Sequence, residues 1–78
     1  MSCNLLEFIP KIKFLCKTLI VETKEGDFTI DITQNGFYYI EKRFFANADQ
    51  VVGYIPESII RVIELDHEKD EEVFLYTK

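Results

Sequence analysis

Apolar and polar residues alternate along much of the chain, with the period of two that is typical of β-strands. The clearest example is the run at 28–33, in which Phe28, Ile30 and Ile32 alternate with polar residues. Similar runs predict further strands at 12–24, 37–45, 51–55, 59–65 and 73–76. The run at 59–65 also fits a helix, but its β-branched residues favour a strand.

Turn residues separate these runs. Gly26 in Glu25-Gly26-Asp27 can adopt a positive φ, and Asn35-Gly36 favours a two-residue type I′ hairpin turn. In the run at 12–24 the apolar positions change face near Thr18, so we expect a bulge or a sharp bend there. At the N-terminus, Asn4 is placed to cap a single helical turn that Pro10 ends.

Together these elements predict a mainly β protein, a small, strongly bent antiparallel barrel of five or six strands with a short N-terminal helical turn. The 78 residues are enough for one domain, which we assign to 1–78. A core of this size rarely leaves more than about 3–5 kcal/mol of net stability. We therefore expect a homo-oligomer, in which neighbouring copies cover further apolar surface.

The excess of acidic charge is confined to the second half of the chain. The chain has a formal net charge of −5, and residues 1–45 carry as many basic as acidic side chains, so the whole excess lies in 46–78. Nucleic-acid binding depends on a basic face, which only the first half of the chain can provide.

The cellular location follows from cysteine content and hydropathy. The two cysteines, Cys3 and Cys16, do not form a disulfide framework and favour a reducing compartment. We find no signal peptide pattern and no apolar run near the roughly 20 residues that span a bilayer. We expect a cytoplasmic protein without a membrane partner.

Residue types that carry catalysis are sparse. The single histidine, His67, lies among acidic residues in a predicted turn, but no second histidine or nearby cysteine completes a metal site. Neither a hydrolytic triad signature nor a phosphate-binding glycine loop is present in the sequence. The sequence therefore predicts no enzyme activity, no catalytic residues, no metal and no cofactor.

Two sets of residues are candidates for binding. The first combines cations with an aromatic ring and suits RNA or a nucleotide, because aromatic rings stack on bases: Lys13, Lys17, Tyr38, Lys42 and Arg43. Alternatively, these lysines protect an edge strand and the aromatic residues belong to the core or a subunit interface. The second set is acidic and suits a basic protein partner: Glu68, Asp70, Glu71 and Glu72. Alternatively, it is a solvated hairpin that favours solubility.

The order of the elements over Asn4–Leu65 resembles that of Sm-like small barrels. Gly26 lies at the family's first turn, and the segment from Ile55 to Leu65 is similar to its closing pair of strands. The resemblance implies rings, formed by pairing of the last strands of neighbours, and RNA binding by loop residues. At the RNA-binding positions, however, this chain has Gln34-Asn35-Gly36 and Pro56-Glu57 in place of the family's residues.

We therefore favour a non-enzymatic Sm-like binding module for nucleic acid or nucleotide. The rival hypothesis is an acidic interaction or inhibitor protein, of the type that phages and mobile elements encode, which docks on a basic partner.

Overall fold

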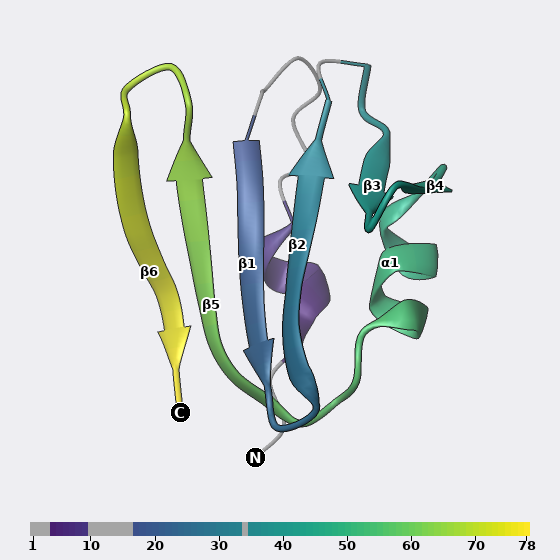
Figure 1. Cartoon of the computed structure of the whole chain (residues 1–78), viewed down its shortest axis with the longest axis vertical. Helices are drawn as coiled ribbons and strands as arrows, with labels where there is room; N and C mark the ends of the chain where they lie inside the picture. Colours follow the sequence, from purple (N-terminus) through teal and green to yellow (C-terminus); the bar gives the residue numbers. More distant parts are fainter. Residues whose placement is uncertain (1–3, 10–16, 34) are drawn as a thin grey trace.

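The structure is a computed structural model that describes residues 4–9, 17–33 and 35–78. Its main element is one six-stranded antiparallel sheet with the strand order β4-β3-β2-β1-β5-β6 (Figure 1). The strands are β1 Lys17–Thr23, β2 Gly26–Ile32, β3 Tyr38–Ile40, β4 Arg43–Phe45, β5 Ile59–Asp66 and β6 Glu71–Thr77. A 3-10 turn, η1 Leu5–Phe8, precedes the sheet, and a helix, α1 Ala48–Tyr54, connects β4 to β5.

The connections between the strands place β1 in the middle of the sheet. β1 to β4 form a meander, and β5 then pairs with the remaining side of β1, so that Val21 lies opposite both Phe28 and Val62. The predicted mainly β class and N-terminal helical turn are confirmed. The predicted closure into a barrel is not observed, because within the described residues β4 and β6 are open edges.

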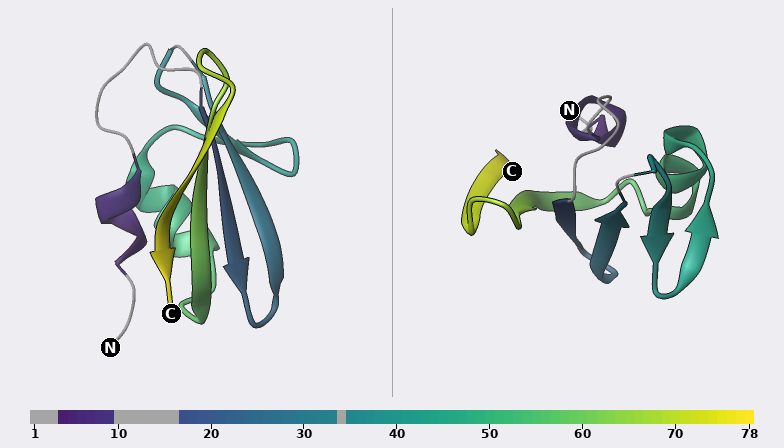
Figure 2. Two further views of the ribbon diagram at one scale, coloured as in Figure 1. Left: turned by 90° about the vertical axis from the view of Figure 1, so that its left-hand side faces the viewer. Right: turned by 90° about the horizontal axis from the view of Figure 1, so that it is seen from above.

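Both helical elements cover the same face of the sheet, and the opposite face carries no described element (Figure 2). The core lies between the sheet and these two elements. Its fully buried side chains come from four strands and the helix: Leu19, Val21, Ile30, Ile40, Val51 and Val62. Leu5 and Ile9 from the N-terminal turn are buried against them.

The N-terminal turn forms for the reason that the sequence indicates. The Asn4 side chain accepts a hydrogen bond from the backbone N–H of Leu6, and the Glu7 N–H donates to the Asn4 carbonyl. These bonds satisfy donors that the start of a helical turn leaves free.

Two predictions about β1 need correction. The turn predicted at Glu25-Gly26-Asp27 lies one residue earlier: Lys24 and Glu25 form it, and Gly26, with a φ of 135°, is the first residue of β2. The expected bulge near Thr18 is wrong for the described residues: β1 pairs regularly there, and its irregularity lies between Glu22 and Thr23, opposite β5. The predicted strand at 12–16 lies outside the described residues.

The turn at Asn35-Gly36 is present but is not the two-residue type I′ turn that we predicted. The connection between β2 and β3 is closed by a 2.9 Å hydrogen bond from the Thr33 N–H to the Phe37 carbonyl. Inside it, the Gly36 N–H donates to the Thr33 carbonyl over 3.0 Å, and Gly36 has a φ of 78°.

The single strand predicted at 37–45 is wrong, because this segment is a hairpin. Ile40 lies opposite Arg43, so the turn between β3 and β4 consists of Glu41 and Lys42 alone. Their φ values are 51° and 69°. Positive φ at both central residues defines the type I′ turn, whose twist matches that of the flanking strands.

The strand predicted at 51–55 is also wrong, because Val51 to Tyr54 belong to α1. Asn47 caps this helix by accepting a 3.0 Å hydrogen bond from the Gln50 N–H, and the Gln50 side chain accepts one from Ala46. These reciprocal bonds resemble a capping box. The strands predicted at 59–65 and 73–76 are confirmed as parts of β5 and β6.

Candidate functional site

Of the residues predicted to bind nucleic acid, those that the structure describes do not form one surface. Lys13 lies outside the described residues. Lys17 is held by Glu64, whose carboxylate lies 2.8 Å from the ammonium, and this hydrogen bond raises the pKa of Lys17. Tyr38 is 8% exposed and belongs to the core, as in the alternative that the sequence left open for the aromatic residues.

The other two predicted cations lie in or next to the β3–β4 turn. Lys42 is exposed in the turn itself. Arg43 lies opposite Ile40, on the face that the helices cover, and its guanidinium is 5.6 Å from the centre of the Tyr54 ring. This distance is within the range of a cation–π contact. The predicted basic and aromatic face is therefore not assembled by the described residues.

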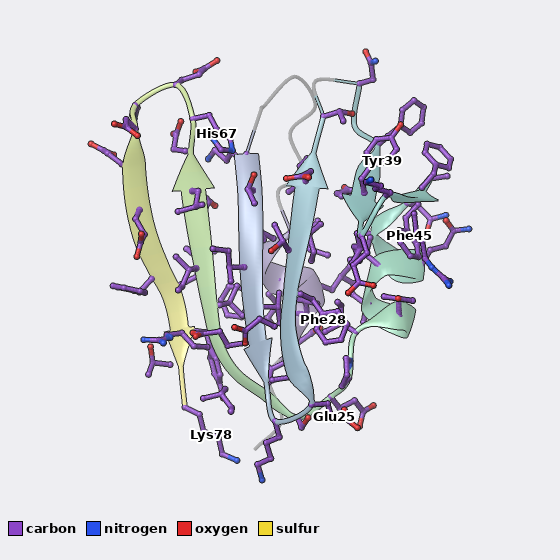
Figure 3. The ribbon with its side chains drawn as sticks, in the orientation of Figure 1. Glu25, Phe28, Tyr39, Phe45, His67 and Lys78 are labelled. Atoms are coloured by element: carbon purple, nitrogen blue, oxygen red, sulfur yellow. The ribbon has the colours of Figure 1, made fainter. Side chains whose placement is uncertain are left out.

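A different set of aromatic side chains is exposed, and we call it the aromatic cluster: Phe37, Tyr39 and Phe44. The ring of Phe44 lies 5.1 Å from that of Phe37 and 5.7 Å from that of Tyr39. Tyr39 and Phe44 face away from the core, because Tyr38 and Phe45 beside them in the hairpin pack inward. Lys42 lies in the turn between Tyr39 and Phe44. Figure 3 shows Tyr39 near the rim of the sheet.

The acidic set lies together, and we call it the acidic hairpin: Glu68, Asp70, Glu71 and Glu72. All four side chains are exposed in the β5–β6 turn and the start of β6. The turn is ordered by Asp66, whose carboxylate accepts hydrogen bonds from the backbone N–H groups of Glu68 and Lys69. The structure thus presents several carboxylates on one well-formed turn.

His67 joins this turn to the uncovered face of the sheet. The buried Thr18 hydroxyl donates to Asp31 over 3.1 Å and lies 2.7 Å from the His67 Nε2. Since a hydroxyl has only one proton, His67 acts as the donor to Thr18. In this arrangement the Thr18 hydroxyl bridges the Asp31 carboxylate and the His67 ring.

A second ion pair joins Arg61 of β5 to Glu22 of β1. The guanidinium donates to both carboxylate oxygens, and this hydrogen bonding lowers the pKa of Glu22. Arg61 also lies 5.8 Å from the centre of the Phe74 ring. Two cations that could neutralise a polyanion, Lys17 and Arg61, are therefore engaged within the fold.

One pocket of about 370 Å³ opens between η1, α1 and the start of β5. Five of the seven residues that line it are apolar, and Asn4 and Glu57 contribute polar groups. In the part of the chain that the structure describes, His, Cys, Asp and Glu side chains form no cluster suited to a metal ion. The pocket therefore has the size of a small-ligand site.

Neither η1 nor α1 has the length and hydropathy to cross a lipid bilayer. Searches against family models, curated proteins and solved structures gave no match for this chain.

Proposed function

We propose that the chain is a non-enzymatic protein-interaction module, which binds a basic segment of another protein through the acidic hairpin. The observation that carries this proposal is the exposure of four carboxylates on one ordered β-turn and the strand that follows it. Neither ion pair within the described residues involves them. A partner with clustered Lys or Arg side chains is the chemical complement of this surface.

The test compares two variants with equal changes in net charge. One replaces all four residues of the acidic hairpin by Ser; the control replaces four exposed acidic residues elsewhere by Ser: Glu7, Glu25, Glu41 and Asp49. A partner recovered by the wild-type chain is purified, and its affinity for each variant is measured over a salt series. We expect loss of binding for the hairpin variant only. Equal binding by both variants would reject the acidic hairpin as the site.

A second candidate function is the binding of single-stranded nucleic acid or nucleotide, and the aromatic cluster favours it. Exposed rings stack on bases regardless of sequence, at about 1–3 kcal/mol per base. Lys42 in the same hairpin can contact a phosphate. The support is weaker than for a protein partner, because Asp31 lies opposite Tyr39 and Glu41 precedes Lys42.

Fluorescence anisotropy with a short RNA at low salt tests this second function. Binding that weakens in Phe44→Ala but not in Phe74→Ala, an exposed ring on another strand, would support it. No binding at any salt concentration would reject it.

The relationship to Sm-like barrels remains a proposal. The order of elements from η1 to β5 supports it, whereas α1 departs from the expected pattern by replacing the strand at 51–55. Closure of the sheet into a barrel and assembly into rings are further expectations of that relationship.

A further inference from the structure

The outer edge of β6 is open. β6 pairs with β5 and with no other strand in the part of the chain that the structure describes, and it forms one rim of the sheet (Figure 1). An open edge presents unpaired backbone N–H and C=O groups to any strand that can approach. Seven residues of β6 are available for such pairing.

Two of the features that protect edge strands are missing from β6. Its sequence from Glu71 to Thr77 contains no proline and no lysine. Two of its apolar side chains, Val73 and Phe74, are 43% and 59% exposed. The pairing of β6 with β5 is irregular at one position only, opposite Val62 and Ile63. An exposed apolar edge of this kind favours pairing with another strand.

The charges along β6 indicate which strand it receives. Glu71 and Glu72 lie at its start, and Lys78 follows its last residue. Lys78 lies at the opposite end of the sheet from His67 in the β5–β6 turn (Figure 3). A strand that complements this edge must therefore place a basic residue beside Glu71 and Glu72 and an acidic residue beside Lys78. A second copy of β6 that runs antiparallel meets both conditions.

We propose that β6 pairs antiparallel with β6 of a second copy of this chain and forms a two-fold symmetric dimer with a continuous sheet. A two-fold axis perpendicular to the sheet preserves both faces, so one residue near the middle of β6 must lie opposite its own equivalent. Three residues can take that place: Val73, Phe74 and Leu75. With Phe74 or Leu75 in that place, Lys78 comes level with Asp70, the residue before β6, or with Glu72 of the second copy.

Pairing centred on Phe74 or Leu75 therefore places an acidic residue opposite Lys78 at each end of the contact. It also brings the exposed Val73 and Phe74 side chains of both copies to the centre of the contact. The dimer goes beyond the proposed function and does not depend on it. Each copy keeps further carboxylates of its acidic hairpin, and the two hairpins lie at opposite ends of the paired strands.

The dimer is tested with variants that reverse the charges at the two ends of β6. Sedimentation velocity over a concentration series measures their association. The wild-type chain of 9.2 kDa is expected to shift to twice this mass as its concentration rises. Lys78→Glu and the double variant Asp70→Lys/Glu72→Lys should each raise the dissociation constant at least about tenfold, because each places like charges opposite one another. An equimolar mixture of the two variants should dimerise again, since both contacts are then complementary.

Matched controls carry the same charge changes at exposed positions away from β6: Lys24→Glu, and Glu25→Lys combined with Asp49→Lys. They should dimerise like the wild type. Circular dichroism verifies that every variant is folded. A monomer at all concentrations, a mixture that fails to dimerise or equal effects of the controls would overturn the proposal. A larger closed oligomer would also overturn it and would indicate head-to-tail pairing of β4 with β6.

Discussion

Glu41 and Lys42 hold backbone conformations that their side chains disfavour. Both residues have positive φ in the β3–β4 turn, at 51° and 69°. This region of the φ/ψ map suits Gly and Asn, and other residues adopt it at a cost of order 1 kcal/mol or more each. The fold retains the turn because β3 and β4 pair through Ile40 and Arg43 on either side of it.

Replacing Glu41-Lys42 by Asn-Gly should therefore stabilise the protein. We expect the free energy of unfolding to rise by about 1 kcal/mol, because the relief of strain exceeds the entropy that Gly adds to the unfolded chain. Urea denaturation measures the change. As a control, Lys24→Gly in the β1–β2 turn should lower stability, since Lys24 does not have positive φ. A lower unfolding free energy for Asn-Gly would contradict the strain argument.

Thr18 links two polar side chains on the uncovered face. Thr18 is 7% exposed, and its hydroxyl contacts both Asp31 and His67. Thr18→Val keeps the shape but removes these hydrogen bonds, so we expect a loss of about 1 kcal/mol in unfolding free energy. Thr29→Val, at an exposed position of β2, is the matched control and should change stability little. Equal effects of both substitutions in urea denaturation would show that the Thr18 hydrogen bonds contribute nothing.

At the scale of elements, local pattern predicted some segments well and others poorly. Alternation in β2 and the β-branched run in β5 were sufficient, because β2 buries alternate apolar residues and β5 consists largely of residues that favour strands. The helix α1 was missed, since Val51 and Val52 favour strands by composition. The signal that indicates the helix is its capping sequence, in which Asn47 precedes Gln50 by three residues.

The candidate site was harder to predict than the strands. Tyr38 and Tyr39 are adjacent and chemically alike, and only the pairing of Tyr38 with Ile32 decides which ring is buried. Lys17 and Glu64 are 47 residues apart in the sequence, so their ion pair follows from the tertiary fold. The acidic hairpin was predictable because its residues are neighbours in the chain.

The capping of α1 can be tested directly. Asn47→Ala removes the oxygen that accepts the Gln50 N–H, and we expect a loss of about 1 kcal/mol in unfolding free energy. Asn47→Asp should preserve stability, because its carboxylate accepts the same hydrogen bond. Thermal or urea unfolding followed by circular dichroism measures both. A similar loss in the two variants would indicate that the Asn47 amide has another role.

At the scale of the whole molecule, the charges divide into two groups with different roles. Lys17 and Arg61 form ion pairs with Glu64 and Glu22, and these pairs tie β1 to β5 in the middle of the sheet. The acidic hairpin takes no part in them. The two pairs between β1 and β5 therefore support the fold, while the carboxylates near β6 remain available for partners.

The Glu22–Arg61 pair predicts how stability responds to acid. Hydrogen bonding to Arg61 lowers the pKa of Glu22 below its ordinary value of 4.5. A group with a lowered pKa in the folded state contributes stability above its unfolded pKa, and this contribution disappears as the pH falls through the folded value. The wild-type chain should therefore lose part of its unfolding free energy below about pH 4.5 because Glu22 becomes protonated.

Glu22→Gln removes this titrating group and should make the loss between neutral pH and pH 3 smaller than in the wild type. Urea denaturation at both pH values measures the difference, and Glu25→Gln, an exposed turn residue outside both ion pairs, is the control for the change of a single carboxyl. The pair contributes no acid sensitivity if Glu22→Gln and the wild type lose the same amount. A smaller loss in Glu22→Gln alone would assign that part of the acid response to the contact between β1 and β5.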